Sequence, residues 1–257
     1  AERQQEFLGD LGFFTPTPVE LVEAPYAKPL LPKNWSDIVV MTASYGHGFS
    51  SSPLHLATGY ASLLNGGTKV TPTLLKREGP VPVGPRIVQS EVSEAARSML
   101  RQVVVRGTAR FGEVPGYAVG GKTGTADKPK ENGGGYYDDK VIATFASVFP
   151  ANDPKYVLIV TLDEPSENSG DKPRRTAGWT AVPVAAEMIR RVGHVRVFAA
   201  LGSTISAVLI LYPVLAEVWV WTLGRVVIGF CFAGVYVTAE SWLNNAATNE
   251  NRGQALS

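Results

Sequence analysis

The sequence is poor in cysteine and histidine, and it has almost no excess of either charge. Its one cysteine, Cys231, excludes an internal disulfide framework and a cysteine-rich zinc site. Its three histidines (His47, His55 and His194) stand too far from one another and from paired carboxylates to indicate a metal site. With 24 basic and 23 acidic residues the net charge is +1, and no basic stripe carries interleaved aromatics. We therefore expect no metal, no cofactor and no nucleic-acid partner.

Charge is nearly absent from the C-terminal end, where residues 197–257 hold only five charged side chains (Glu217, Arg225, Glu240, Glu250 and Arg252). Residues 197–216 are uncharged and would form a helix of about 30 Å, which matches the hydrocarbon core of a bilayer. Residues 218–239 are similar, and tryptophans lie near the ends of these stretches (Trp219, Trp221 and Trp242). The sequence predicts an all-α transmembrane hairpin, with helices 197–216 and 218–239, in a segment 193–257. A buried pair of core helices is the alternative.

The remainder of the chain has the pattern of a mixed α and β protein. Ser52 followed by Pro53 is typical of a helix start, and the glycines after Asn65 indicate its end. A second amphipathic helix follows Ser90 and ends at Gly107. We expect an antiparallel meander of three strands, a Gly/Asp/Lys-rich loop between the first two, and a last helix packed on one face: 117–126, 141–149 and 156–162 for the strands, 128–140 for the loop and 180–192 for the helix.

The sharpest local signal is the sequence GGKTGTA at residues 120–126, within the first predicted strand. The ammonium of Lys122 and the hydroxyls of Thr123 and Thr125 can hold a carboxylate, and Gly124 lets a substrate backbone approach closely. A backbone N–H near the end of such a strand can also serve an oxyanion hole. A phosphate loop is excluded, because its spacing and its following helix are missing. The simpler alternative is a glycine-rich strand with an exposed lysine.

Together with its surroundings, this segment resembles the C-terminal part of the transpeptidase domain of class B penicillin-binding proteins, especially the division-type peptidoglycan transpeptidases. The resemblance covers residues 1–192. It implies an α+β serine β-lactamase/transpeptidase-like fold, and a peptidoglycan stem peptide or β-lactam bound by Lys122, Thr123, Gly124 and Thr125. The matching stretches follow the family order: 42–48, 52–57, 60–61, 65–67, 104–109 and 120–126, then ATFASVFP and YVLIVTLDEP.

Two of the family's three motifs are not in place. The family uses the serine of S-x-x-K as nucleophile and a second S-x-N motif beside it, and K-T-G comes third. Here only K-T-G is in place, so we expect the other two upstream of Ala1. The chain also begins without methionine or a signal segment, and we expect it to be a piece of a longer protein.

Two short sequences imitate the missing motifs. Ser169–Lys172 fits S-x-x-K and Ser166–Asn168 fits S-x-N, but both follow K-T-G and share one polar loop. His47 and His55 near Ser52 imitate a serine–histidine pair, yet no acid is placed to orient them, and we interpret both as packing residues. We therefore predict no catalytic residue in this fragment, no peptidoglycan cross-linking and no stable penicilloyl adduct.

The C-terminal segment resembles two transmembrane helices of a major facilitator superfamily transporter, of an expected twelve. Residues 191–196 are similar to the end of a basic cytoplasmic loop, and Arg225-x-x-x-Gly229 is similar to a motif of the fourth helix. Further matches are Ala233-Gly234, Glu240–Asn244 and Asn251–Gly253. An arginine within an apolar span marks a functional position by default.

The two resemblances imply opposite sides of the bacterial inner membrane. Basic residues before the first predicted span favour the cytoplasm (Arg190, Arg191 and Arg196), whereas a peptidoglycan transpeptidase works on the periplasmic side. We interpret the chain as a chimera of a truncated transpeptidase domain, 1–192, and a partial transporter, 193–257. We expect this chain to have no enzymatic activity. The alternatives are an active, membrane-tethered enzyme completed upstream, and a major facilitator transporter with a non-catalytic soluble domain.

Overall fold

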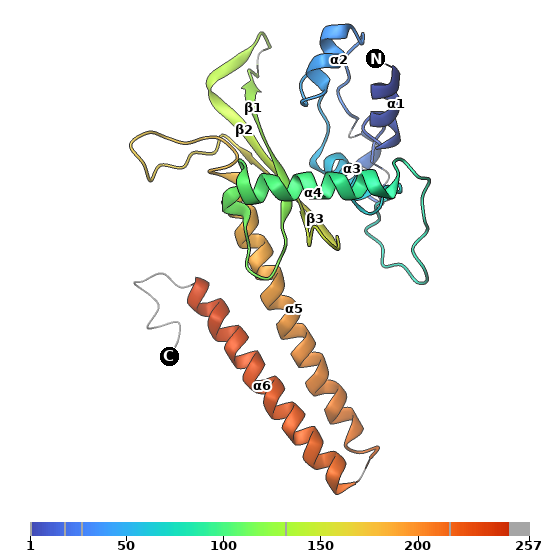
Figure 1. Cartoon of the computed structure of the whole chain (residues 1–257), viewed down its shortest axis with the longest axis vertical. Helices are drawn as coiled ribbons and strands as arrows, with labels where there is room; N and C mark the ends of the chain where they lie inside the picture. Colours follow the sequence, from blue (N-terminus) through green and yellow to red (C-terminus); the bar gives the residue numbers. More distant parts are fainter. Residues whose placement is uncertain (1, 18, 27, 132, 216, 247–257) are drawn as a thin grey trace. The chain divides into compact units, whose positions relative to one another are not determined.

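The computed structural model describes residues 2–17, 19–26, 28–131, 133–215 and 217–246 (Figure 1). The chain divides into two compact units, Ala1–Ala186 and Glu187–Ser257. The boundary between them falls inside one helix, α5, which runs from Ala181 to Leu211. The division that the sequence predicts, at 192/193, falls within the same helix and stays a prediction.

The first unit contains four α-helices and a three-stranded sheet in its described part (Figure 1). Ser52 caps α3, because its Oγ accepts a hydrogen bond from the N–H of His55 at 3.3 Å, and Pro53 occupies the first turn. The predicted start and end of this helix are confirmed. The elements are α1 (Glu2–Asp10), α2 (Asp37–Ala43), α3 (Pro53–Leu64), α4 (Ser90–Arg106), the 3₁₀ turns η1 (Ala24–Tyr26) and η2 (Arg110–Gly112), β1 (Gly120–Pro129), β2 (Tyr136–Phe149) and β3 (Tyr156–Asp163).

The sheet is antiparallel in the order β1-β2-β3, so the predicted meander is confirmed. Within it β1 pairs with β2 alone and is an edge strand. The loop predicted between the first two strands is present, but its predicted bounds, 128–140, are too wide, because β1 continues to Pro129 and β2 already begins at Tyr136. Three successive glycines with positive φ turn the chain in a short distance and leave the flanking residues free to pair (Gly133, Gly134 and Gly135).

Two glycines allow β1 to lie close to its neighbours. A Cβ on Gly121 would lie 2.6 Å from the ring of Phe145, which is fully buried beneath the sheet. A Cβ on Gly120 would lie 3.3 Å from the backbone nitrogen of Arg101 in α4. The Arg101 guanidinium in turn donates to the Val119 carbonyl at 2.9 Å and to the Glu113 carboxylate at 2.8 Å. These contacts fix the start of β1 against α4 and β2.

The second unit contains the rest of α5 and helix α6, which runs from Val218 to Ala246 (Figure 1). The predicted separate helices at 180–192 and 197–216 are wrong: α5 is continuous from Ala181 and ends at Leu211. Nothing in the intervening sequence breaks a helix strongly, whereas Pro213 ends it, since proline has no N–H and restricts the residue before it.

Small residues of α6 face α5. A Cβ on Gly224 would lie 2.6 Å from the Tyr212 ring, and one on Gly234 would lie 2.7 Å from Leu201. Between them along α6, Cys231 is buried. The two helices therefore contact each other along a seam of small side chains, as close helix packing requires.

Among the described residues, one helix is long and apolar enough to cross a membrane. It is Val218–Tyr236, with 19 residues, a mean hydropathy of 1.7 and 11% of its length buried. The apolar stretch that the described residues of α5 contain, Ala199–Leu211, is shorter. The predicted hairpin of two transmembrane helices is therefore not confirmed.

We predict that Gly121→Ala destabilises the first unit, because its methyl group would overlap Phe145. Overpacking of this kind costs about 1–3 kcal/mol. The matched control is Gly124→Ala on the same strand, where the nearest atom to an added Cβ is the Thr144 carbonyl oxygen at 4.0 Å. Urea unfolding followed by circular dichroism should show a lower midpoint for Gly121→Ala alone. Equal midpoints for the two variants would contradict the packing of β1 on Phe145.

We predict that Glu113→Gln lowers the free energy of unfolding at neutral pH but not in strong acid. The hydrogen bond from Arg101 lowers the pKa of Glu113 below its usual 4.5, so the pair stabilises the fold above that value. This contribution is lost as the pH falls through the lowered pKa. The pair is partly exposed, and we expect about 0.5 kcal/mol. Thermal melting should separate variant and wild type at pH 7 and bring them together near pH ~2; a constant difference would contradict the pair's role.

Candidate ligand-binding site on the edge strand

The K-T-G segment lies in the middle of β1, where side chains alternate between the two faces of the sheet. Lys122 pairs with Ala146, Thr123 with Phe145 and Gly124 with Thr144. Thr123 and Thr125 share a face, and Lys122 and Gly124 lie on the other. The four residues predicted to bind the substrate are therefore divided between the two faces of the strand.

A cavity of about 560 Å³ lies on the threonine face. Thr123 and Thr125 line it, and neither Lys122 nor Gly124 is among its lining residues. The Lys122 ammonium is exposed and donates to the Thr123 carbonyl at 2.7 Å. The other lining residues come from the turn after α4 and from the segment before α5: Gly107, Thr108, Arg110, Phe111, Thr176, Ala177, Gly178 and Trp179.

Hydrogen bonds hold the threonine hydroxyls at this cavity. Thr125 Oγ1 accepts from the N–H of Ala177 at 3.0 Å, which leaves its own hydrogen free to donate. The hydroxyls of Thr108 and Thr123 are 2.6 Å apart, so one donates to the other and the second hydrogen remains available. Two hydroxyl donors are thus available in the cavity, an arrangement that suits a carboxylate.

Two aromatic residues, Phe111 and Trp179, form a wall of the cavity, and one arginine lies over each ring. The rings of Phe111 and Trp179 lie 5.0 Å apart, centroid to centroid. The Arg174 guanidinium stacks on Trp179 at 4.0 Å, and that of Arg110 lies 5.2 Å from the Phe111 centroid. Sequence reasoning missed this wall. It also assigned no role to Thr108, although Thr108 lies in the 104–109 stretch that matches the family.

The loop before α5 is organised by its own polar groups. The carboxylate of Glu167 accepts from the Ser169 N–H at 2.6 Å. Hydrogen bonds from the Ser169 side chain and then from its N–H lower the pKa of Glu167. The backbone N–H of Glu167 also donates to the Arg174 carbonyl, and the N–H of Arg174 donates to the Glu167 carbonyl, each at 2.9 Å. The hydroxyl of Ser166 donates to the Asn168 side chain at 2.7 Å. The two imitation motifs therefore belong to a loop structure, and none of their residues lines the cavity.

The structure gives His55 a structural role, as predicted. Its Nδ1 lies 2.7 Å from Ser52 Oγ and its Nε2 lies 2.8 Å from the Thr15 carbonyl, so both nitrogens of this buried ring are occupied. His47 lies against the Tyr136 ring, with centroids 6.2 Å apart. Among the described residues, no group of three or more His, Cys, Asp or Glu side chains could hold a metal ion.

Comparison with known proteins identifies the family. Residues 1–186 match the penicillin binding protein transpeptidase domain. This match covers most of the chain, and the chain therefore belongs to that family.

The similar proteins agree with this assignment. The chain is 36% identical over 199 residues to the "Probable peptidoglycan D,D-transpeptidase FtsI" of Caulobacter vibrioides, covering 74% of this chain and 33% of that protein. It is 29% identical over 202 residues to the Stage V sporulation protein D of Bacillus subtilis, covering 74% and 30%. It thus spans about a third of the length of these relatives.

A solved structure is similar in fold as well as in sequence. Penicillin-binding protein 3 from Mycobacterium tuberculosis, crystallised with ampicillin, superposes with a TM-score of 0.65 at 30% identity. The match covers 75% of this chain and 46% of that one. The α+β transpeptidase-like fold expected from the sequence is confirmed.

Proposed function

We propose that residues 1–186 carry the carboxylate-recognition part of a peptidoglycan D,D-transpeptidase domain. The ligand is the carboxylate end of a stem peptide or a β-lactam, and it lies in the cavity beside Thr123 and Thr125. The observation that supports this most directly is the pair of free hydroxyl donors, one from Thr125 and one from the Thr108–Thr123 pair. The family and the relatives named as peptidoglycan D,D-transpeptidases supply the substrate class.

The other two motif residues have different roles in this proposal. Lys122 lies on the opposite face, so its charge attracts the anion without a direct contact. The outer edge of β1 is open because β1 is the edge strand of the sheet, and Gly124 presents no side chain that a ligand would have to avoid. An extended peptide can then pair with this edge through backbone hydrogen bonds.

We also propose that the 257-residue chain binds its ligand reversibly and does not form an acyl-enzyme. The sequence contains no S-x-x-K and no S-x-N ahead of Lys122. The nucleophile and its base act as a unit, and loss of either removes nearly all covalent catalysis. Binding through the threonine face does not need them.

We predict that the purified chain binds a fluorescent penicillin reversibly and that Thr123→Val weakens this binding about tenfold. The valine removes the hydroxyl that shares hydrogens with Thr108, and a hydrogen bond to a charged group is worth about 1.5–3 kcal/mol. Thr123→Ser is the matched control, because it keeps the hydroxyl. Fluorescence anisotropy measures the affinity. Fluorescent penicillin that stays on the chain in a denaturing gel would refute reversible binding. Equal affinities of the Thr123→Val and Thr123→Ser variants would refute the binding site at Thr123.

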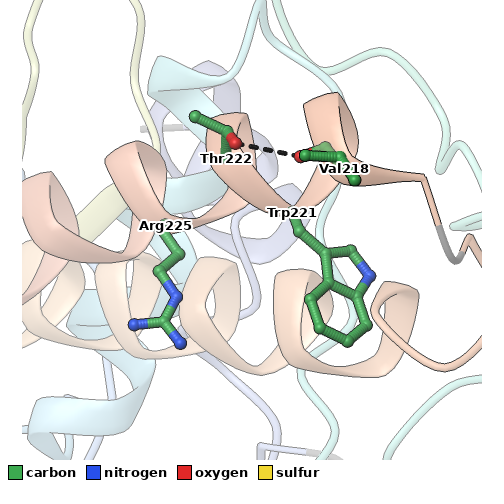
Figure 2. Close-up of a pocket in the computed structure, with 4 residues that line it drawn as sticks. All are labelled: Val218, Trp221, Thr222 and Arg225. Carbon is green, nitrogen blue, oxygen red and sulfur yellow. Dashed lines mark hydrogen bonds between the residues drawn. The ribbon is translucent and has the colours of Figure 1, made fainter.

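For the C-terminal unit we propose that residues 218–236 of α6 cross a bilayer. The support is the length and apolarity of this stretch and its low burial. Val218, Trp221, Thr222 and Arg225 line a hollow of about 500 Å³ on α6. Figure 2 shows their side chains along this helix. Arg225 lies seven residues into the helix, about 10 Å along its axis, so its side chain can extend to the headgroups beside Trp221.

This proposal would place the chain at a bacterial inner membrane, with the transpeptidase domain on the periplasmic side. The transporter resemblance, the transporter alternative and the interpretation as a chimera stay predictions. So does the conflict of topology that the basic residues before the first predicted span create.

We predict that the chain floats with phospholipid vesicles after a carbonate wash and that Val226→Glu reduces this fraction. Val226 is exposed on α6, and a carboxylate within a span costs about 2.5–3.5 kcal/mol. Val226→Leu is the control and should float like the wild type. A wild-type chain released by carbonate would contradict the membrane-spanning proposal.

A further inference from the structure

The cavity on the threonine face is much larger than one carboxylate. Its volume is about 560 Å³, whereas a water molecule takes up about 30 Å³ in the liquid. The two free hydroxyl donors account for one anionic group on the β1 side. Phe111 and Trp179 line the same cavity, and the threonine hydroxyls do not account for what these two rings would bind.

The described lining of the cavity carries positive charge only. Arg110 is the one charged side chain among the described lining residues, and no acid lines the space. Within the part of the chain that the structure describes, the ion pairs do not include Arg110. Its guanidinium lies over the Phe111 ring, at 5.2 Å, and keeps its hydrogen-bond donors for another group.

The second arginine of the wall differs from the first. Arg174 is not a lining residue, and it stacks on Trp179 at 4.0 Å. Its Nη1 lies 3.8 Å from the Glu167 carboxylate, which offsets part of its charge. Arg174 thus supports the Trp179 ring, and Arg110 is the cation that a ligand can reach.

We propose that Arg110, with Phe111 and Trp179, forms a second anion subsite that selects ligands carrying a second carboxylate beside the one held at Thr123 and Thr125. The ligand class is an acidic peptide or a dicarboxylate β-lactam. This inference rests on the proposed function, because the first carboxylate sets where the second one falls. The aromatic rings bind the apolar part of the ligand between its two charges.

Three penicillins that differ at one carbon test the subsite. Benzylpenicillin has a neutral side chain, carbenicillin carries a carboxylate on the benzylic carbon, and ampicillin carries an ammonium there. Each competes with a fluorescent penicillin for the full 257-residue chain, and anisotropy gives the affinity. We expect carbenicillin to bind about tenfold more tightly than benzylpenicillin at low salt, and ampicillin to bind most weakly.

The variant Arg110→Gln should remove this preference, bringing carbenicillin and benzylpenicillin within about twofold of each other, because carbenicillin loses more affinity than benzylpenicillin does. Arg106→Gln is the matched control: Arg106 is exposed in the last turn of α4, close in sequence to Arg110, and does not line the cavity. It should keep the preference. Circular dichroism of each variant checks folding, and Arg110→Lys, which keeps the charge, should retain part of the preference if Arg110→Gln is unstable.

The outcomes separate the two proposals. If no penicillin displaces the probe from the wild-type chain, the proposed function itself fails. If all three bind with equal affinity, or if Arg110→Gln weakens all three equally, the first carboxylate site stands and the second anion subsite is refuted. If Arg106→Gln abolishes the preference as Arg110→Gln does, the selectivity comes from the general field of the α4 end, and the subsite is refuted as well.

Discussion

The close contact between β1 and the buried ring of Phe145 is the constraint on which the rest of the first unit depends. It requires glycine at position 121, because any Cβ there would lie 2.6 Å from the ring. Gly120 makes similar room for α4, and Arg101 then binds the chain at Val119. With the strand fixed in this way, alternation places Thr123 and Thr125 on the cavity side and Lys122 on the other. The binding surface is therefore a consequence of how the sheet packs.

The hydroxyl groups that face the cavity and the charged side chain of Lys122 lie on opposite faces of β1. The threonines make the direct contacts that we propose for a carboxylate, and each is held by a partner from another segment, Thr108 or Ala177. Under the same proposal, Lys122 acts on the ligand at longer range. The aromatic wall combines Phe111, from the turn after α4, with Trp179, from the segment before α5. A site built from such separate parts can bind a ligand without the nucleophile, and its selectivity can reside far along the chain from the K-T-G motif.

The C-terminal unit shows where composition misleads. Residues 197–216 contain no charge, and their length alone matches a bilayer. Pro213 nevertheless ends α5 at Leu211, and the helix continues upstream into the last helix of the first unit. Among the described residues, α6 contains the one stretch long and apolar enough to span a bilayer, Val218–Tyr236. Counting charges located the apolar region correctly, but the helix boundaries depend on a local backbone restriction that composition does not register.

Local patterns in the sequence predicted most secondary-structure elements of the first unit and the family. The Ser52-Pro53 cap, the three-stranded meander and the K-T-G motif are short-range patterns, because each depends on neighbouring residues or on simple periodicity. Which residues contact the motif side chains on each face of the sheet depends on tertiary packing. Thr125 contacts Ala177 across 52 positions of sequence, and Phe111 contacts Trp179 across 68. Such pairs depend on strand register and on the packing of Phe145 against Gly121, which no local pattern encodes.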